Sequence, residues 1–280
     1  MAKSNVQNSK VRRSQFLKQC LAGLGVALLM AACGGDGTTT GGSSGAKILK
    51  VATEPAFAPF ESKAADGQLE GFDIEIMQAA GKAAGLTVEF QSLPFDGIIP
   101  ALQANTVDAA ISAMTITPER TKTVDFSRPY FKAGLAIAVQ DKDTSITSLD
   151  SLKNKKIAVQ IGTTGATTAK GVSGAKVSSF DSAPLALQEL ANGNVDAVVN
   201  DAPVTLDAIK KGNIKGLKVV GQLLTEEYYG IAFPKGSANL SAINTGLDQL
   251  ITDGTYAEIY KKWFGAEPPK LPDTVPAAKP

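Results

Sequence analysis

Apolar and polar positions between residues 48 and 112 follow two alternating periods. Some stretches are short, largely apolar segments of the kind found in strands. Others place apolar side chains three or four residues apart, which is typical of one buried face of a helix. This pattern predicts strands over residues 48–53, 87–90 and 108–112 and helices over 72–84 and 98–103. Strands that alternate with helices indicate an α/β domain with a largely parallel sheet.

A second series of the same kind begins near residue 135. It predicts strands over residues 135–139, 156–160, 176–178, 196–200 and 217–220, and helices over 164–170, 183–191 and 202–210. A further strand over 229–233 and helices over 240–252 and 256–263 follow, and the last helices are expected to return to the first lobe. We therefore expect two lobes, residues 47–131 with 229–267 and residues 132–228, with the chain crossing near 130–136 and 223–230. Residues 268–280 are expected to form a loose tail.

The first 46 residues differ from this pattern. Residues 1–32 contain no acidic residue, and five basic residues precede a ten-residue apolar run at 21–30. This pattern indicates a secretory signal peptide, whose apolar run is too short to span a bilayer. The run ends in LMAAC, which resembles the lipobox of bacterial lipoproteins, so Cys33 is expected to carry a lipid anchor; ordinary cleavage nearby is the alternative. Residues 33–46 are rich in Gly, Ser and Thr and are expected to form a flexible linker.

Charge and composition narrow the classes of function. The 280 residues contain 28 basic and 27 acidic side chains, and removal of the five basic residues of the signal leaves 23 against 27, a net charge of −4. Nucleic acid is therefore not expected as a partner. The chain has no histidine, its two cysteines are Cys20 in the signal and Cys33, and no G-x-S-x-G turn occurs. Most nucleophilic and metal-dependent routes are closed, so neither an enzyme nor a cofactor is expected.

The segment MTITPER, residues 114–120, contains an unusual arginine. Thr117 followed by Pro118 predicts the start of a helix. Arg120 then lies in the first helical turn, where the backbone N–H groups already present positive charge. The position therefore indicates an anion nearby, which a bound ligand could supply.

Eight segments carry a resemblance to a known family: VATEPAFAPFE (51–61), GFDIEIMQAAGKAAG (71–85), FDGIIPALQ (95–103), MTITPERTKTVDFSRPY (114–130), IGTTGA (161–166), NDAPV (200–204), GIAFPKGS (230–237) and DGTYAEIYKKWFG (253–265). In this order they resemble the amino-acid-binding proteins of bacterial ABC importers, solute-binding protein family 3. The resemblance implies a type II periplasmic-binding-protein fold, in which two α/β lobes joined by two crossing strands close on one amino acid. It also implies a monomer, located outside the cytoplasm, that delivers its ligand to a membrane permease.

The resemblance further implies which residues hold the ligand. Arg120 is expected to bind the α-carboxylate with its planar guanidinium, aided from the other lobe by Thr164. The hydroxyl of Thr115 and the carbonyl of Ala113 are expected to hold the α-ammonium group, with Asp201 as its charge partner.

Side-chain selection is expected to depend on Glu54, Gln160 and Asn200. Glu54 remains as an unpaired negative charge once Arg120 and Asp201 are matched to the ligand, and Gln160 is neutral, so a basic ligand, arginine or lysine, is favoured. Glutamine is the main alternative because its amide can donate to Glu54. Phe57 and Phe95 are expected to stack on the ligand side chain. A dehydratase on the same fold and a receptor or sensor module are weaker alternatives.

Overall fold

The computed structural model describes residues 47–211 and 214–275. The predicted signal peptide, Cys33 and the predicted linker lie outside these residues. Over the described ranges, no helix is both long and apolar enough to cross a bilayer.

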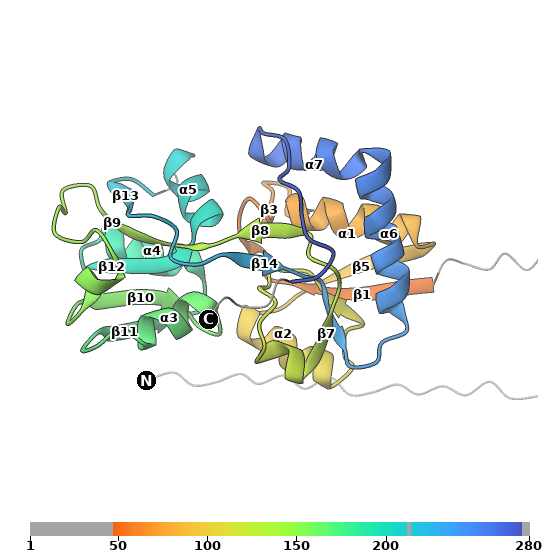
Figure 1. Ribbon diagram of the computed structural model, residues 1–280, viewed down its shortest axis with the longest axis horizontal. Helices are drawn as coiled ribbons and strands as arrows, with labels where there is room; N and C mark the ends of the chain where they lie inside the picture. Colours follow the sequence, from red (N-terminus) through yellow and green to blue (C-terminus); the bar gives the residue numbers. More distant parts are fainter. Residues whose placement is uncertain (1–46, 212–213, 276–280) are drawn as a thin grey trace, which may run out of the picture. The chain divides into compact units, whose positions relative to one another are not determined.

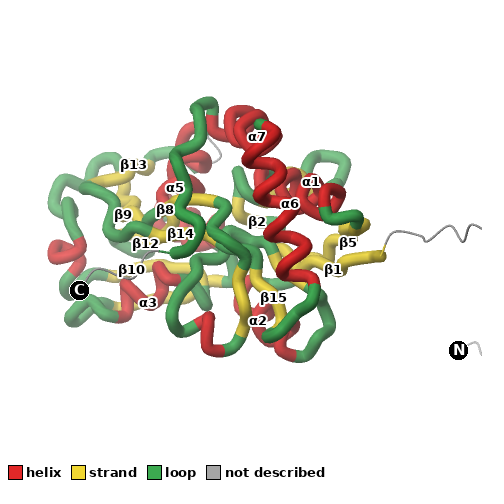
Figure 2. Tube along the Cα trace, turned by 45° about the vertical axis from the view of Figure 1, so that its right-hand side comes forward, coloured by secondary structure: helices red, strands yellow, loops and turns green. Residues whose placement is uncertain are grey.

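The first lobe is built on a five-stranded sheet in the order β5-β1-β6-β15-β7 (Figure 1). Strand β1 pairs in parallel with β5 and β6, whereas β15 pairs antiparallel with β6 and β7. Helices α1, α6 and α7 pack together beside this sheet (Figure 2). The bounds are β1 Lys47–Thr53, β5 Leu86–Ser92, β6 Ala109–Ala110, β7 Val124–Phe126, β15 Ala232–Pro234, α1 Phe72–Ala83, α2 Phe95–Gln103, α6 Asn239–Asp253 and α7 Thr255–Phe264.

A small antiparallel sheet of β2 (Ala56–Phe57), β3 (Glu61–Lys63) and β4 (Leu69–Glu70) extends the first lobe and leads into α1. Gly71 precedes the helix with φ of 139°, and a Cβ there would lie 2.0 Å from the carbonyl oxygen of Phe60. Only glycine permits this approach. The turn thereby directs Phe72 and the apolar face of α1 into the core of the lobe.

The second lobe contains a sheet in the order β11-β10-β12-β9-β13. Strand β10 is parallel to β11 and β12, whereas β9 is antiparallel to β12 and β13. Apolar clusters lie on both faces of the sheet, beneath helices α3, α4 and α5. The bounds are β9 Leu135–Gln140, η2 Leu149–Leu152, β10 Lys156–Gln160, α3 Thr164–Lys170, β11 Lys176–Phe180, α4 Ala183–Ala191, β12 Ala197–Asp201, α5 Ala202–Lys210 and β13 Leu217–Val220.

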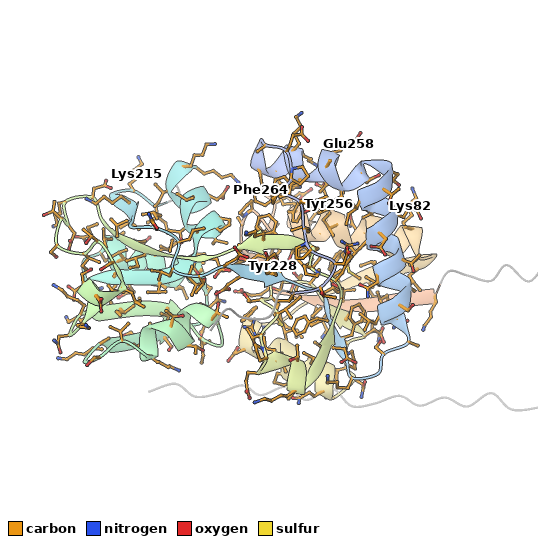
Figure 3. The ribbon with its side chains drawn as sticks, in the orientation of Figure 1. Lys82, Lys215, Tyr228, Tyr256, Glu258 and Phe264 are labelled. Atoms are coloured by element: carbon orange, nitrogen blue, oxygen red, sulfur yellow. The ribbon has the colours of Figure 1, made fainter. Side chains whose placement is uncertain are left out.

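Two strands, β8 (Phe131–Ala133) and β14 (Glu227–Tyr229), link the lobes as an antiparallel pair. They run side by side between the two five-stranded sheets in Figure 1, and Figure 3 labels Tyr228 on this bridge. The segment around Thr115 joins them, because Thr115 forms an isolated antiparallel bridge with Tyr229. This pairing brings the start of the MTITPER segment against the linking strands.

Three local predictions from the sequence were wrong. Each large sheet is mixed rather than largely parallel, because its remaining strands return in the opposite direction. The single strand expected over 229–233 is divided between β14 and β15. The helix expected after Pro118 is one 3-10 turn, η1 (Arg120–Lys122). The Thr117 Oγ accepts a hydrogen bond from Arg120 N at 3.1 Å, as a helix cap would, but the chain then enters β7. Sheet pairing outweighs the local start signal.

The described part of the expected loose tail contacts the first lobe. Arg128 Nη2 lies 3.0 Å from an oxygen of Asp273, and Leu271 packs, partly buried, against the core. These contacts hold residues 271 and 273 on the lobe.

Candidate functional site

The candidate site lies where the parallel strands of both lobes end. Gln160 is the last residue of β10, Asp201 is the last of β12, and Glu54 follows β1. Carboxyl ends of parallel strands are the usual place for ligand sites in α/β sheets. The cavity between the lobes has a volume of about 10 Å³, and its lining residues come from both: Phe57, Phe95, Ser112, Ala113, Thr115, Arg120, Gln160, Thr163, Thr164 and Asp201.

Arg120 crosses from the first lobe to the second. Its Nη1 donates to the carbonyl oxygen of Thr115 at 2.7 Å, and its Nη2 donates to that of Gly162 at 3.0 Å. The guanidinium carbon lies 5.3 Å from the centre of the Phe95 ring. Burial lowers the pKa of Arg120, and the negative charges of Asp201 and Glu227 act in the opposite sense. The positive charge thus faces two carboxylates, while its hydrogen bonds go to backbone carbonyls.

Asp201 and Glu227 form the acidic side of the site. The buried carboxylate of Asp201 accepts a hydrogen bond from the hydroxyl of Tyr229. Burial, reinforced by the charge of Glu227, raises the pKa of Asp201 to about 7. Glu227 Oε2 accepts hydrogen bonds from Thr115 Oγ at 2.5 Å and from Thr164 Oγ at 3.0 Å. One oxygen of Glu227 therefore joins a threonine of each lobe.

Glu54 and Gln160 meet at another point between the lobes. Gln160 Nε2 donates to Glu54 Oε2 at 2.9 Å, and the Oε1 of Gln160 is buried without a hydrogen-bond partner among the described residues. Burial raises the pKa of Glu54 to about 7, although the Gln160 amide partly opposes this shift. Near neutral pH a nearby cation would therefore stabilise the ionised form of Glu54.

Two buried acidic residues, Glu61 and Asp73, lie behind the residues that line the site. Glu61 and Asp73 are fully buried, and burial raises both pKa values, that of Asp73 to about 6 and that of Glu61 well above its usual range. Asp73 Oδ2 accepts from Ala113 N at 2.7 Å and from the hydroxyl of Tyr130 at 2.7 Å. Ala113 has a φ of 44°, a strained value for alanine that these contacts maintain.

Ser112 connects this acidic pair to Glu54. Its hydroxyl donates to Glu61 Oε1 at 2.9 Å and accepts from the backbone N–H of Glu54 at 3.1 Å. The backbone of both Glu54 and Ala113 is therefore fixed from behind by buried carboxyl groups.

In the second lobe, a close approach of backbone places Thr164. A Cβ on Gly165 would lie 2.7 Å from the carbonyl oxygen of Val199, so glycine allows the start of α3 to lie against β12. Thr163 caps this helix, since its Oγ accepts from Ala166 N at 3.1 Å. Thr164 and Asp201 are thereby brought to the same edge of the lobe.

The structure brings together most of the residues singled out from the sequence. Those that line the cavity are Phe57, Phe95, Ala113, Thr115, Arg120, Gln160, Thr164 and Asp201. Glu54 adjoins it through Gln160. Asn200 does not line it, because its amide is buried and donates to Thr205 Oγ at 3.3 Å. Phe95 lines the cavity and also lies beside the guanidinium of Arg120, so its expected stacking on a ligand stays a prediction.

Sequence reasoning missed four contributors: Ser112, Thr163, Glu227 and Tyr229. A signal existed for Glu227 and Tyr229, because both fall in the predicted crossing over 223–230. Residues two apart on a strand share a face. Once Tyr229 is placed toward Asp201, Glu227 is expected on the same side.

Two α/β lobes linked by a pair of strands, with a polar site at the carboxyl ends of their parallel strands, define a type II periplasmic binding protein. Residues 49–266 match the family described as "Bacterial extracellular solute-binding proteins, family 3", and the chain belongs to this family.

Relatives with named ligands are similar over most of the chain. A "Probable histidine-binding protein" of Neisseria gonorrhoeae is 36% identical over 86% of this chain and 92% of its own length. "An ancestral arginine-binding protein bound to arginine" is 49% identical, with a TM-score of 0.76, over 78% of this chain and 98% of that one. The corresponding structure bound to glutamine is 48% identical, with a TM-score of 0.73 and the same coverage. These relatives are binding proteins, and this chain is not an enzyme.

Proposed function

We propose that this protein binds an L-amino acid with a cationic side chain, arginine or lysine, outside the cytoplasm and delivers it to an ABC permease. Cys33 carries the lipid that anchors it to the membrane, and it acts as a monomer. The observation that carries the proposal is the placement of Arg120, Asp201 and Glu54 around one site between the lobes. An amino acid with a basic side chain presents three complementary charges.

In this function the ligand α-carboxylate pairs with the guanidinium of Arg120 and accepts from the hydroxyl of Thr164. The α-ammonium group is held by Asp201 and the carbonyl of Ala113. A basic side chain extends toward Glu54, with the buried Oε1 of Gln160 as a further acceptor. Phe57 supplies an apolar wall. Each ligand charge then has an opposite partner, as burial of a charge requires.

The lobes must separate to admit the ligand. A cavity of about 10 Å³ holds no more than about one water, whereas ligand pockets occupy about 300 to 1,000 Å³. Contacts between the lobes include Arg120 with Gly162 and Gln160 with Glu54, and Thr164 of the second lobe also contacts Glu227 of the linking strand. Strands β8 and β14 are the connections about which the lobes would move, in the hinge motion of such proteins.

Glutamine is the second candidate. The carboxyl of Glu54 has a pKa of about 7, so near neutral pH it is partly protonated and can pair with a neutral amide. A relative of known structure is bound to glutamine, which supports this alternative. Arginine and lysine are preferred because Glu54, Asp201 and Glu227 outnumber the single cation Arg120 among the described residues of the site.

The test begins with melting temperatures of the protein in the presence of each of the twenty amino acids. A ligand at one hundred times its dissociation constant adds about 2.7 kcal/mol to stability, which such a screen detects. Isothermal titration calorimetry then compares the wild type with Arg120→Ala. Loss of a buried charge partner costs about 2 to 5 kcal/mol, which is about 30-fold or more in affinity.

Lys122→Ala is the control for the Arg120 variant. Lys122 is exposed, two residues away, and pairs only locally with Glu119, so its removal should leave affinity within about twofold. Retained affinity in Arg120→Ala would contradict the assigned role. The absence of any stabilising amino acid would refute the proposed function.

A further inference from the structure

Glu227 is a buried acidic residue on a strand that links the lobes. It is 7% exposed and pairs with Ala133 across the antiparallel pair of β14 and β8. Its Oε2 accepts from Thr115 of the first lobe and Thr164 of the second, and its Oε1 accepts from Thr225 Oγ at 3.1 Å. Each of these three contacts is to a neutral hydroxyl.

The charge around Glu227 is unbalanced. Glu227 and Asp201 interact electrostatically with each other and with Arg120. Within residues 47–211 and 214–275, no lysine or arginine nitrogen forms an ion pair with either carboxylate. Two buried carboxylates that face one cation leave a negative charge uncompensated, which is costly. The site therefore favours a further positive charge beside Asp201 and Glu227.

We infer that Glu227 is a second ammonium-binding residue, and that its carboxylate and that of Asp201 together bind the α-ammonium group of the ligand. This inference rests on the proposed function. When the ligand carboxylate takes the hydroxyl of Thr164, Glu227 Oε2 loses one of its two donors. An ammonium N–H replaces that donor and adds charge compensation.

The donor count of the ligand agrees with this arrangement. An α-ammonium group has three N–H donors. Asp201, Glu227 and the carbonyl of Ala113 supply three acceptors, one from the second lobe, one from the linking strand and one from the first lobe. The α-ammonium is common to all primary amino acids, so Glu227 recognises the amino acid class, whereas Glu54 selects among side chains.

The alternative is that Glu227 only accepts hydrogen bonds from the two threonines and that its charge takes no part in ligand binding. Glu227→Gln separates the two roles, because the amide oxygen can still accept from Thr115 and Thr164 but carries no charge. Glu226→Gln is the matched control, one residue earlier. Glu226 is directed elsewhere, since it pairs with Lys132 at 2.8 Å and accepts from the hydroxyl of Tyr228 at 2.8 Å.

Calorimetry at pH 8 would compare the wild type, Glu227→Gln and Glu226→Gln, with L-arginine, L-lysine and L-glutamine as probes. We expect Glu227→Gln to weaken every probe that binds the wild type by about tenfold or more, and by similar factors. Glu226→Gln should stay within about twofold. Glu227→Asp retains the charge and should bind more tightly than Glu227→Gln, an order that also decides the case if the amide variant is less stable.

Unchanged or tighter binding by Glu227→Gln would overturn the inference and leave the proposed function intact. A loss confined to one of the three probes would also overturn it, because it would place Glu227 at the ligand side chain. If the wild type binds none of the twenty amino acids, the proposed function fails and this inference fails with it.

Discussion

Replacement of Glu54 by glutamine tests whether charge selects the ligand. The variant keeps the size of the side chain and an oxygen that can accept from Gln160 Nε2, which lies 2.9 Å from Glu54 Oε2. What it removes is the negative charge facing a guanidinium or ammonium group. A hydrogen bond to a charged group contributes about 1.5 to 3 kcal/mol, so arginine affinity should fall by about 10- to 150-fold.

The expected effect on glutamine is much smaller. The ligand amide is neutral, and the new amide at position 54 still offers an acceptor, so we expect its affinity to change by no more than about threefold. The measurement is calorimetric titration at pH 8, above the pKa of about 7 of Glu54, where the wild-type carboxylate is mostly ionised. At lower pH part of the binding energy would be spent on removing its proton.

Glu89→Gln supplies the control for overall charge. Glu89 lies on β5 of the same lobe with an exposed side chain, so the variant has the same net charge as Glu54→Gln. It should bind both ligands as the wild type does. Equal losses of arginine and glutamine affinity in Glu54→Gln, or an unchanged arginine affinity, would refute selection by charge.

Two further predictions concern pH and the anchor. Glu54 and Asp201 both have pKa values of about 7, so arginine affinity should fall between pH 8 and pH 6, and binding should release protons, which calorimetry in buffers of different ionisation enthalpy detects. An arginine affinity that does not change with pH would contradict the raised pKa values. Without ligand, the folded protein holds protons on these two groups that the unfolded chain has released. Their contribution to stability is therefore present near pH 4 and is lost as pH rises through 7. Cys33→Ser should abolish incorporation of labelled palmitate and release the protein from membranes, and a labelled Cys33→Ser protein would exclude that cysteine as the acylation site.

The strand ends that form the site were predictable because buried strands leave a strong signal. Residues 48–53 and 156–160 are short segments with an apolar centre, and β1 and β10 end where those segments end. The sequence therefore predicts that the polar residues at the ends of these strands lie at the edge of a sheet. The hydrogen bonds of Arg120 to the carbonyls of Thr115 and Gly162 left no such signal, because every residue carries a carbonyl.

Asn200 and Glu227 show how strand geometry decides between plausible polar residues. Asn200 and Asp201 are adjacent on β12, so their side chains point to opposite faces, and only Asp201 reaches the cavity. On β14 the same rule separates Tyr228, which contacts Glu226, from Glu227 and Tyr229, which face Thr115 and Asp201. The family resemblance suggested both Asn200 and Asp201 as contacts, whereas the period of two along a strand permits one.

The contacts between the lobes make ligand binding an exchange of hydrogen bonds. Arg120 Nη2 already donates to the carbonyl of Gly162, Thr164 donates to Glu227, and Gln160 donates to Glu54. In the proposed complex, a basic amino acid would replace the neutral carbonyl at Arg120 with a carboxylate and would bring cations to Glu227 and Glu54. Because exchange of equal hydrogen bonds gains little, the net affinity comes from the steps in which a neutral partner gives way to a charged one. Charge rather than the number of contacts is therefore what this site can use to distinguish a basic amino acid from glutamine.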